Sequence, residues 1–182
     1  KIAKNSQNNL IEDENEAIEL LEKTLLESVQ SQLISDVPLG AFLSGGIDSS
    51  VIVSLMQKVS KKPVETFTIG FEESAFNEAI YAKEVAKYLG TDHHELYVTA
   101  SDAFKVIPHL PTLYDEPFAD SSQIPTYLVS KLAKQKVTVS LSGDAGDELF
   151  GGYNRYLWGS RIWSKAKWIP PNLRSIVGGV IQ

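Results

Sequence analysis

The stretch Leu43-Ser-Gly-Gly-Ile-Asp-Ser-Ser50 completes a short apolar segment, Pro38–Leu43, and opens a predicted helix over about residues 49–59. The apolar segment predicts a buried strand. The stretch is therefore expected at the carboxyl end of that strand, where α/β sheets bind phosphate groups. Gly45 and Gly46 allow a tight turn and a close approach of the backbone to an anion. Since the helix adds the positive end of its dipole, these residues predict a phosphate-binding loop.

Asp48 is the informative residue of this loop. A carboxylate beside a phosphate is repulsive unless a divalent cation lies between them, so we expect Asp48 to be a magnesium ligand. Hydroxyl donors are offered by Ser44, Ser49 and Ser50. The simpler alternative is a turn in which Asp48 only caps the helix. The position after a strand favours the functional interpretation. The loop is not a Walker A loop, because it lacks Gly-Lys-Ser/Thr.

Strands and helices alternate along the rest of the chain, which predicts a parallel sheet with helices on both faces. We expect an α/β fold of about five strands, preceded by an amphipathic helix over Glu14–Ser35 and followed by a helical part after Leu149. The predicted division is a tail or linker over 1–13, a main domain over 14–150 and a helical continuation over 151–182. The further predicted strands are 65–71, 94–98 and 136–141. The further predicted helices are 76–89, which Gly90 ends, a short helix that Ser101 caps and that ends before Pro108, and 123–135, and residues 110–122 are predicted to form a loop.

Composition excludes several classes of protein. The 182 residues are 43% hydrophobic, which is ordinary globular usage, and the net charge of −6 argues against a broad nucleic-acid surface. No apolar run approaches the about 18 residues that span a bilayer, so no membrane partner is expected. Cysteine is absent, so the chain has no disulfide, no zinc-thiolate site and no thiol nucleophile. Because the chain begins with Lys1 and its one methionine is Met56, we expect a fragment of a longer protein.

A second loop, Leu141–Tyr153, also follows an apolar strand. Ser142 and Gly143 repeat the Ser-Gly of the first loop, and three carboxylates follow within a few residues: Asp144, Asp147 and Glu148. Such a cluster is costly unless it is solvated or binds a metal. A solvated acidic turn is the simpler alternative. Its place at a strand end, in a sheet that already has a phosphate loop, favours a functional site.

The first loop resembles the pyrophosphate loop of the ATP pyrophosphatases, which cleave ATP between its α and β phosphates. From about Ala17 to Tyr156 the chain resembles the synthetase domain of glutamine-hydrolysing asparagine synthetases. The resemblance rests on several ordered blocks: Phe42–Ser50, Thr66–Phe71, Glu84–Glu95, Asp115–Pro117 and Leu141–Tyr153. It implies an adenine nucleotide alpha hydrolase-like fold.

The resemblance also implies residue roles. Positions matching the adenosine site are Leu43, Ile69, Ser142 and Gly143, and those matching the pyrophosphate loop are Ser44, Gly45, Gly46, Asp48, Ser49 and Ser50. Asp48 and Asp147 match the magnesium-binding aspartates. Asp144 matches a catalytic position beside the reacting carboxylate. This is a departure from the pattern, since many members have the longer side chain of glutamate there.

The implied reaction is ATP-dependent amidation of aspartate to asparagine through β-aspartyl-AMP, with AMP and pyrophosphate released. ATP and Mg²⁺ are the expected cofactors, and aspartate and ammonia the expected partners. In the family, ammonia comes from glutamine through an N-terminal domain with a cysteine nucleophile, which this chain lacks. The family's catalytic lysine is also expected to lie beyond this fragment. A cytoplasmic location and a homodimer of the full-length protein complete the expectation.

Three alternatives stay open: amide formation on another carboxylate, a tRNA-modifying pyrophosphatase, and a nucleotide-binding domain that is inactive as a fragment. The acidic charge argues against the second and the paired aspartates against the third. His93 and His94 are adjacent in an extended segment and face opposite ways, so packing is favoured over a shared metal ion. Asp115, Glu116 and Asp120 lie in a predicted loop and are candidates for a substrate pocket or a solvated turn.

Overall fold

The computed structural model describes residues 10–72, 77–116, 119–168 and 170. The chain divides into two compact units, Lys1–Gly143 and Asp144–Gln182, and each is described by itself. The predicted domain boundary lay at residue 150, and most of the predicted tail over residues 1–13 lies outside the described residues. No helix in the described ranges is long and apolar enough to cross a membrane.

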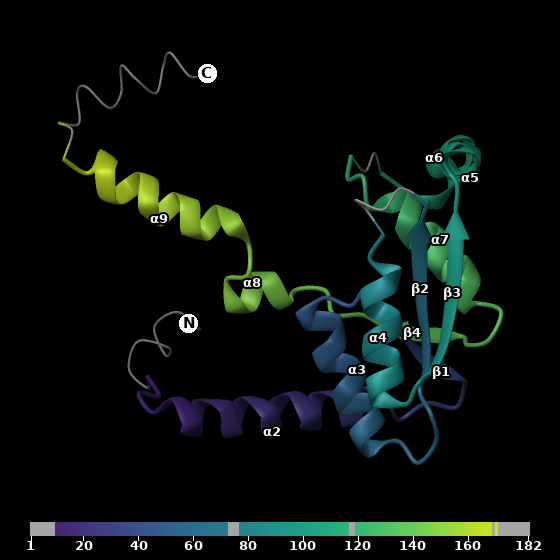
Figure 1. Cartoon of the computed structure of the whole chain (residues 1–182), viewed down its shortest axis with the longest axis horizontal. Helices are drawn as coiled ribbons and strands as arrows, with labels where there is room; N and C mark the ends of the chain where they lie inside the picture. The colour runs from purple at the N-terminus through teal and green to yellow at the C-terminus, as the bar shows by residue number, and fades with distance from the viewer. Residues whose placement is uncertain (1–9, 73–76, 117–118, 169, 171–182) are drawn as a thin grey trace. The chain divides into compact units, whose positions relative to one another are not determined.

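The first unit alternates strands and helices (Figure 1). Its strands are β1 (Leu39–Phe42), β2 (Glu65–Phe71), β3 (Asp92–Val98) and β4 (Val139–Leu141). Its helices are α2 (Glu14–Gln32), α3 (Ile47–Val59), α4 (Ala79–Leu89), α5 (Ala100–Val106), the 3-10 helix η2 (Ile107–His109), α6 (Leu110–Leu113) and α7 (Gln123–Ala133).

The four strands form one parallel sheet in the order β3-β2-β1-β4. Gly40 pairs with Glu65 across β1 and β2, and Glu65 pairs with Asp92 across β2 and β3. The predicted parallel α/β sheet is confirmed, with four strands in the described residues where about five were expected. β1 connects forward to β2, whereas β4 lies on its other side, so the strand order reverses at β1. Such a reversal is where open α/β sheets bind ligands, at the carboxyl ends of the strands.

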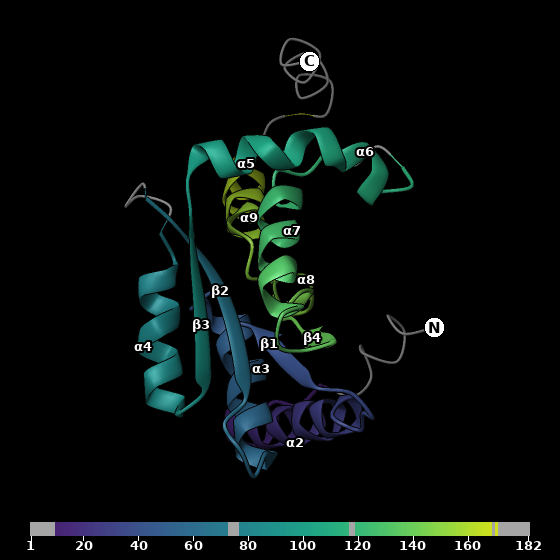
Figure 2. The same ribbon diagram turned by 90° about the vertical axis from the view of Figure 1, so that its right-hand side faces the viewer.

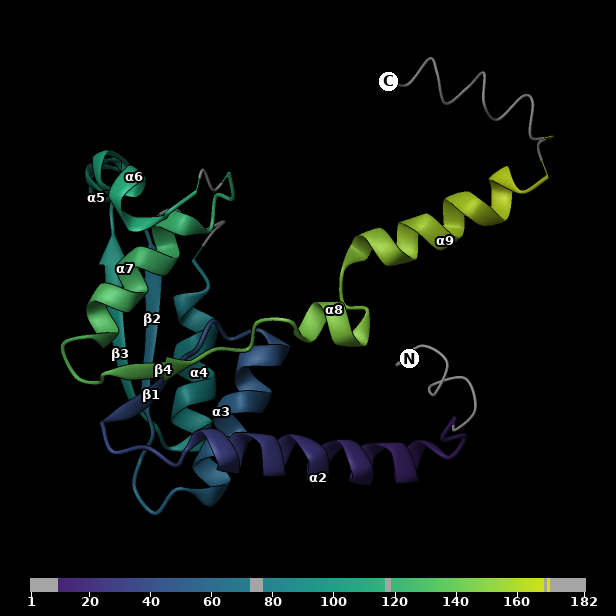
Figure 3. The same cartoon turned by 180° about the vertical axis from the view of Figure 1, so that it is seen from behind.

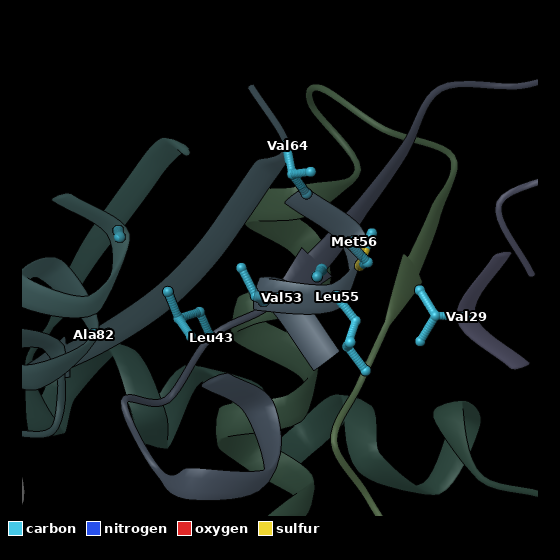
Figure 4. Close-up of a cluster of buried hydrophobic side chains, with 9 residues drawn as sticks. Val29, Leu43, Val53, Leu55, Met56, Val64 and Ala82 are labelled. Atoms are coloured by element: carbon cyan, nitrogen blue, oxygen red, sulfur yellow. The ribbon is translucent and has the colours of Figure 1, made fainter. Parts of the chain in front are cut away.

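Helices cover both faces of the sheet, as predicted (Figures 2 and 3). On one face the core joins α2, α3 and α4 to β1, with Val29, Val53, Met56 and Ala82 at 4% exposure or less (Figure 4). On the other face Phe67, which is fully buried, packs against Ala133, the last residue of α7, and against Val137, which follows that helix. Burial on both faces is seen along β2, where Thr66, Phe67 and Thr68 are all at 4% exposure or less.

Local signals set several boundaries. α4 ends at Gly90, whose φ of 72° is left-handed, as its position after Leu89 predicts. α5 starts at a capping box of Thr99 and Asp102, two residues before the predicted cap Ser101, and it ends before Pro108 as expected. The predicted loop over 110–122 was wrong at its start, where α6 forms instead. The part of the predicted helix over 76–89 that falls on Phe76 lies outside the described residues.

The second unit contains α8 (Gly146–Phe150) and α9 (Asn154–Ala166), in agreement with the helical character predicted after Leu149. α9 buries none of its residues, and Trp158, Trp163 and Trp168 are all more than half exposed.

Candidate functional site

The loop after β1 turns at Gly45, whose φ is +80°. A Cβ at Gly45 would stand 2.6 Å from the amide nitrogen of Ala82, at the start of α4. The position therefore requires glycine for two reasons: its backbone is left-handed, and a neighbouring helix approaches it closely. This is the tight turn that the Ser-Gly-Gly sequence predicts.

The serine hydroxyls of the loop bind the loop's own backbone and one another. Ser49 Oγ accepts from the Ser44 amide at 3.2 Å and lies 3.0 Å from Ser44 Oγ. Ser50 Oγ donates to the Gly46 carbonyl at 2.6 Å. Ser49 is 9% exposed, whereas Ser44 is exposed. Of the predicted hydroxyl donors, Ser49 therefore holds the loop together, and Ser44 has the more open hydroxyl.

α3 begins at this loop with Gly46 as its N-cap, and no side chain caps it. The first-turn amides of a helix have no intrahelical partner, so an uncapped start presents them to an anion. Asp48 lies in this first turn and is half-buried. Within the described residues no hydrogen bond or ion pair reaches its carboxylate. That carboxylate does not cap the helix, which removes the simpler interpretation of Asp48.

The loop after β4 packs directly on the start of α3. A Cβ at Gly143 would stand 2.6 Å from the Ser49 amide nitrogen and 2.7 Å from the Asp48 carbonyl carbon. β1 and β4 are neighbours in the sheet, so their two Ser-Gly loops leave the same edge side by side. Gly143 is needed here because only a bare backbone fits against the helix start.

A cavity of about 550 Å³ opens at the same edge. Its apolar wall includes Leu43, Phe67, Ile69 and Val129, and its polar lining includes Ser44 and Thr68. A mostly apolar cavity of this size with a few polar groups suits the flat base and sugar of a nucleoside. Leu43, Ile69 and Ser44 thus lie around one space. Neither Ser142 nor Gly143 lines it, although Gly143 adjoins the loop that does.

α7 supplies lining residues that the sequence analysis missed. Ser122, Pro125 and Thr126 face the cavity from the start of that helix, together with Glu78 from before α4. The signal was the run of small polar residues before the predicted helix. Asp115 and Glu116, two of the loop carboxylates considered for a substrate pocket, line a different cavity of about 440 Å³.

The acidic residues of the second loop, from Asp144 onward, lie in the second unit and are described within it. Ala145 has a φ of 72°, the one left-handed non-glycine residue in the described chain. A non-glycine residue in that conformation stores strain, which is commonest at functional turns. Asp147, in the first turn of α8, is half-buried, and a Cβ at Gly152 would overlap its carboxylate. Asp144 is exposed.

Glu148 differs from the two aspartates because a tyrosine holds it. Tyr153 Oη donates to Glu148 Oε1 at 2.6 Å, and this bond lowers the pKa of Glu148 and raises the pKa of Tyr153. The Arg155 guanidinium lies 4.1 Å from the centre of the Tyr153 ring. These contacts order the turn that follows α8. Because the Glu148 carboxylate already accepts a hydrogen bond from Tyr153, it is less suited than the aspartates to bind a metal ion.

A family model described as Asparagine synthase matches residues 20–181. The chain belongs to the asparagine synthase family. It is 46% identical over 153 residues to a putative glutamine-hydrolysing asparagine synthetase 2 of Methanocaldococcus jannaschii, which covers 84% of this chain and 30% of the relative. It is 42% identical over 144 residues to asparagine synthetase 1 of Bacillus subtilis, covering 79% and 23%.

Asparagine synthetase B of Escherichia coli is 39% identical over 161 residues, covering 79% of the chain and 28% of that protein. The chain thus spans less than a third of the length of these asparagine synthase relatives. Among solved structures it is similar to an NH3-dependent NAD synthetase from Campylobacter jejuni, with a TM-score of 0.52 and 16% identity over 75% of this chain and 60% of that one. This second likeness shows the fold alone.

Proposed function

We propose that the chain is the synthetase part of an enzyme that makes asparagine from aspartate, ATP and ammonia. The observation that carries the proposal is the combination at one sheet edge of a nucleoside-sized cavity with an uncapped helix start. Family membership and the names of the asparagine synthetase relatives support the choice of reaction.

In the proposed complex, ATP places its nucleoside in the cavity between Leu43 and Ile69. The β and γ phosphates then lie at the loop, against the first-turn amides of α3. Gly45 and Gly143 admit the backbone contacts that hold the loop in this shape. The protein contributes position and charge stabilisation, which are the main sources of rate in phosphoryl and nucleotidyl transfer.

Magnesium fits the carboxylates that the chain offers. Asp48 is half-buried without a partner in the described residues, and Asp147 is half-buried at the start of α8. We infer that Asp48 would hold the ion, and we propose Asp147 as a ligand only because it matches a magnesium-binding aspartate of the family. When bound, the ion neutralises the charge of the pyrophosphate that leaves.

The chemistry follows from these positions. The aspartate β-carboxylate attacks the α-phosphorus of ATP in line, and the bond to pyrophosphate breaks. Ammonia then attacks the acyl carbon of β-aspartyl-AMP, a proton leaves the nitrogen, and AMP departs with the bonding electrons. Asp144 is proposed as a catalytic residue because it matches the family's catalytic position beside the reacting carboxylate. Since its side chain is shorter than the glutamate of many members, amidation of a different carboxylate is the second candidate.

None of the 182 residues is cysteine, so hydrolysis of glutamine by a thiol needs a residue outside this sequence. Free ammonia is therefore the nitrogen donor to use in a test of this chain. A cytoplasmic location and a homodimer of the full-length protein stay predictions.

The test incubates the chain with ATP, magnesium, aspartate and ammonium and measures AMP and pyrophosphate. We expect equal amounts of both, dependent on aspartate, and a loss of at least about tenfold in Asp48→Asn. Asp36→Asn is the matched control, because Asp36 is an exposed carboxylate before β1. Formation of ADP and phosphate would overturn the proposal. Magnesium-dependent ATP binding without turnover would limit the chain to a nucleotide-binding part.

A further inference from the structure

Three side chains converge at the opposite end of the sheet from the phosphate loop. His94 Nε2 lies 2.6 Å from Glu65 Oε2 and 3.7 Å from Asp92 Oδ1. One ligand atom from each residue lies within 4.8 Å of the other two. An imidazole and two carboxylates form a donor set that divalent transition metals take.

The register of the sheet produces this convergence. Glu65 and Asp92 are paired as the first residues of β2 and β3. His94 is two residues after Asp92, so both side chains leave β3 on the same face. A Cβ at Gly40 on β1 would stand 2.7 Å from the Glu65 carbonyl oxygen and 2.8 Å from the Phe67 ring, so glycine leaves room for both.

The histidine ring is held in place. Its ring stacks on that of Phe67, with centroids 5.3 Å apart and planes 25° from parallel, and Phe67 is fully buried. A buried aromatic ring that fixes an imidazole limits the entropy that the histidine loses when it binds a ligand. His93 faces the other way, where its Nδ1 lies 2.9 Å from Thr66 Oγ1.

The charge of the cluster is unmatched. In the described ranges no lysine or arginine forms an ion pair with Glu65 or Asp92. Glu95, on the opposite face of the same strand, has Lys83 at 2.9 Å. Two carboxylates that share one imidazole and lack a cation favour a positive ligand. The side chains are 21% (His94), 32% (Glu65) and 58% (Asp92) exposed, so an ion can reach them.

We propose that Glu65, Asp92 and His94 bind one Zn²⁺ ion, with water in the fourth position. Imidazole nitrogen and carboxylate oxygen bind zinc at about 2.0–2.2 Å, so small side-chain rotations bring all three atoms to one ion. The zinc joins the amino ends of β2 and β3. This site goes beyond the proposed function, because none of its three ligands lines the nucleotide cavity. Glu65 lies about 13 Å from Ile69 along the extended strand.

The experiment titrates the chelator-treated full chain with zinc chloride by calorimetry, and repeats the titration with cobalt chloride to record its visible absorption. We expect one equivalent of zinc per chain and a rise in the unfolding temperature with zinc. His94→Gln and Asp92→Asn should each weaken binding at least about tenfold. His93→Gln should leave it unchanged, since that neighbouring ring lies on the other face. Asp147→Asn tests the second acidic loop as the zinc site.

The absence of stoichiometric zinc binding in the unchanged chain would overturn the proposal, because the cluster would then be a plain ion pair between two strands. Equal loss in His93→Gln and His94→Gln would also overturn it, and so would loss in Asp147→Asn with binding retained in Asp92→Asn. If circular dichroism shows that His94→Gln is unfolded, Asp92→Asn decides, because the Asp92 side chain is 58% exposed and its removal spares the core.

Discussion

Gly143 lies with its Cα against the amide of Ser49, where an added Cβ would be 2.6 Å from the amide nitrogen. The two residues follow different strands, β4 and β1, and their contact joins the two Ser-Gly loops. The atoms that an added methyl group would meet are backbone atoms, which cannot rotate away.

Gly143→Ala therefore tests whether this contact shapes the nucleotide site. We expect the substitution to push the start of α3 from its place, to weaken ATP binding at least about tenfold and to lower the unfolding temperature. ATP affinity is measured by calorimetry. Gly159→Ala is the control, because an added Cβ at this position in α9 would meet no atom within 4 Å beyond the adjoining backbone of its own helix, so ATP affinity should not change. Unchanged ATP affinity in Gly143→Ala would contradict the assignment of the loop.

Thr126→Trp tests the cavity itself. Thr126 is exposed and lines the cavity from α7, so an indole at this position fills the space without disturbing the core. ATP affinity should fall at least about tenfold while the unfolding temperature stays the same. Ser130→Trp, one turn later on the same helix, lines a separate cavity and should bind ATP normally. Equal ATP binding by both variants would place the nucleoside elsewhere.

Ser49→Ala removes the hydroxyl that holds the loop. Ser49 Oγ accepts from the Ser44 amide and is nearly buried, so its loss leaves that amide without its partner. We expect the free energy of unfolding to fall by about 1 kcal/mol, measured by urea denaturation. Ser54→Ala in the same helix removes an exposed hydroxyl that bonds only the Val51 carbonyl, and should change stability less. A larger loss in Ser54→Ala would be the contrary result.

Asp102 makes stability depend on pH at the start of α5. Its hydrogen bonds with the Lys105 ammonium and then with Thr99 lower the pKa of its carboxyl from 3.8 to about 2. Because the folded pKa is the lower one, the stabilisation is present above about pH 4 and is lost as the pH falls toward 2. The difference in unfolding temperature between the unchanged chain and Asp102→Asn should shrink over that interval. A difference that is constant from pH 6 to 3 would show that Asp102 acts without its charge.

Much of the fold was predictable because its signals are local. Apolar strands, the Gly90 stop and the Ser-Gly-Gly turn each depend on a few neighbouring residues, and the structure has them where they were expected. The start of α5 was missed by two residues because Ser101 and Thr99 both suit a cap, and the carboxylate of Asp102 decides between them. Only the folded backbone shows that this carboxylate reaches back to Thr99.

The loops of the nucleotide site were predictable from the sequence, whereas the residues that line its cavity from α7 were not. Ser44 and Gly45 follow a strand, so their position needs no tertiary information. The contribution of Thr126 depends on α7 crossing the sheet beside β2, a packing that no short pattern encodes. The Glu65–His94 contact was not predicted for the same reason. Its two residues lie on neighbouring strands, and only the register of the sheet brings them together.

Because Gly46 gives α3 no side-chain cap, a substitution at this residue that stabilises the helix would weaken the binding of phosphate. Aspartate or serine at position 46 would satisfy a first-turn amide and strengthen the helix by about 1 kcal/mol, yet would compete with phosphate for the same donor. A selection for heat resistance alone would thus favour replacing Gly46, and the improved protein would bind nucleotide less well.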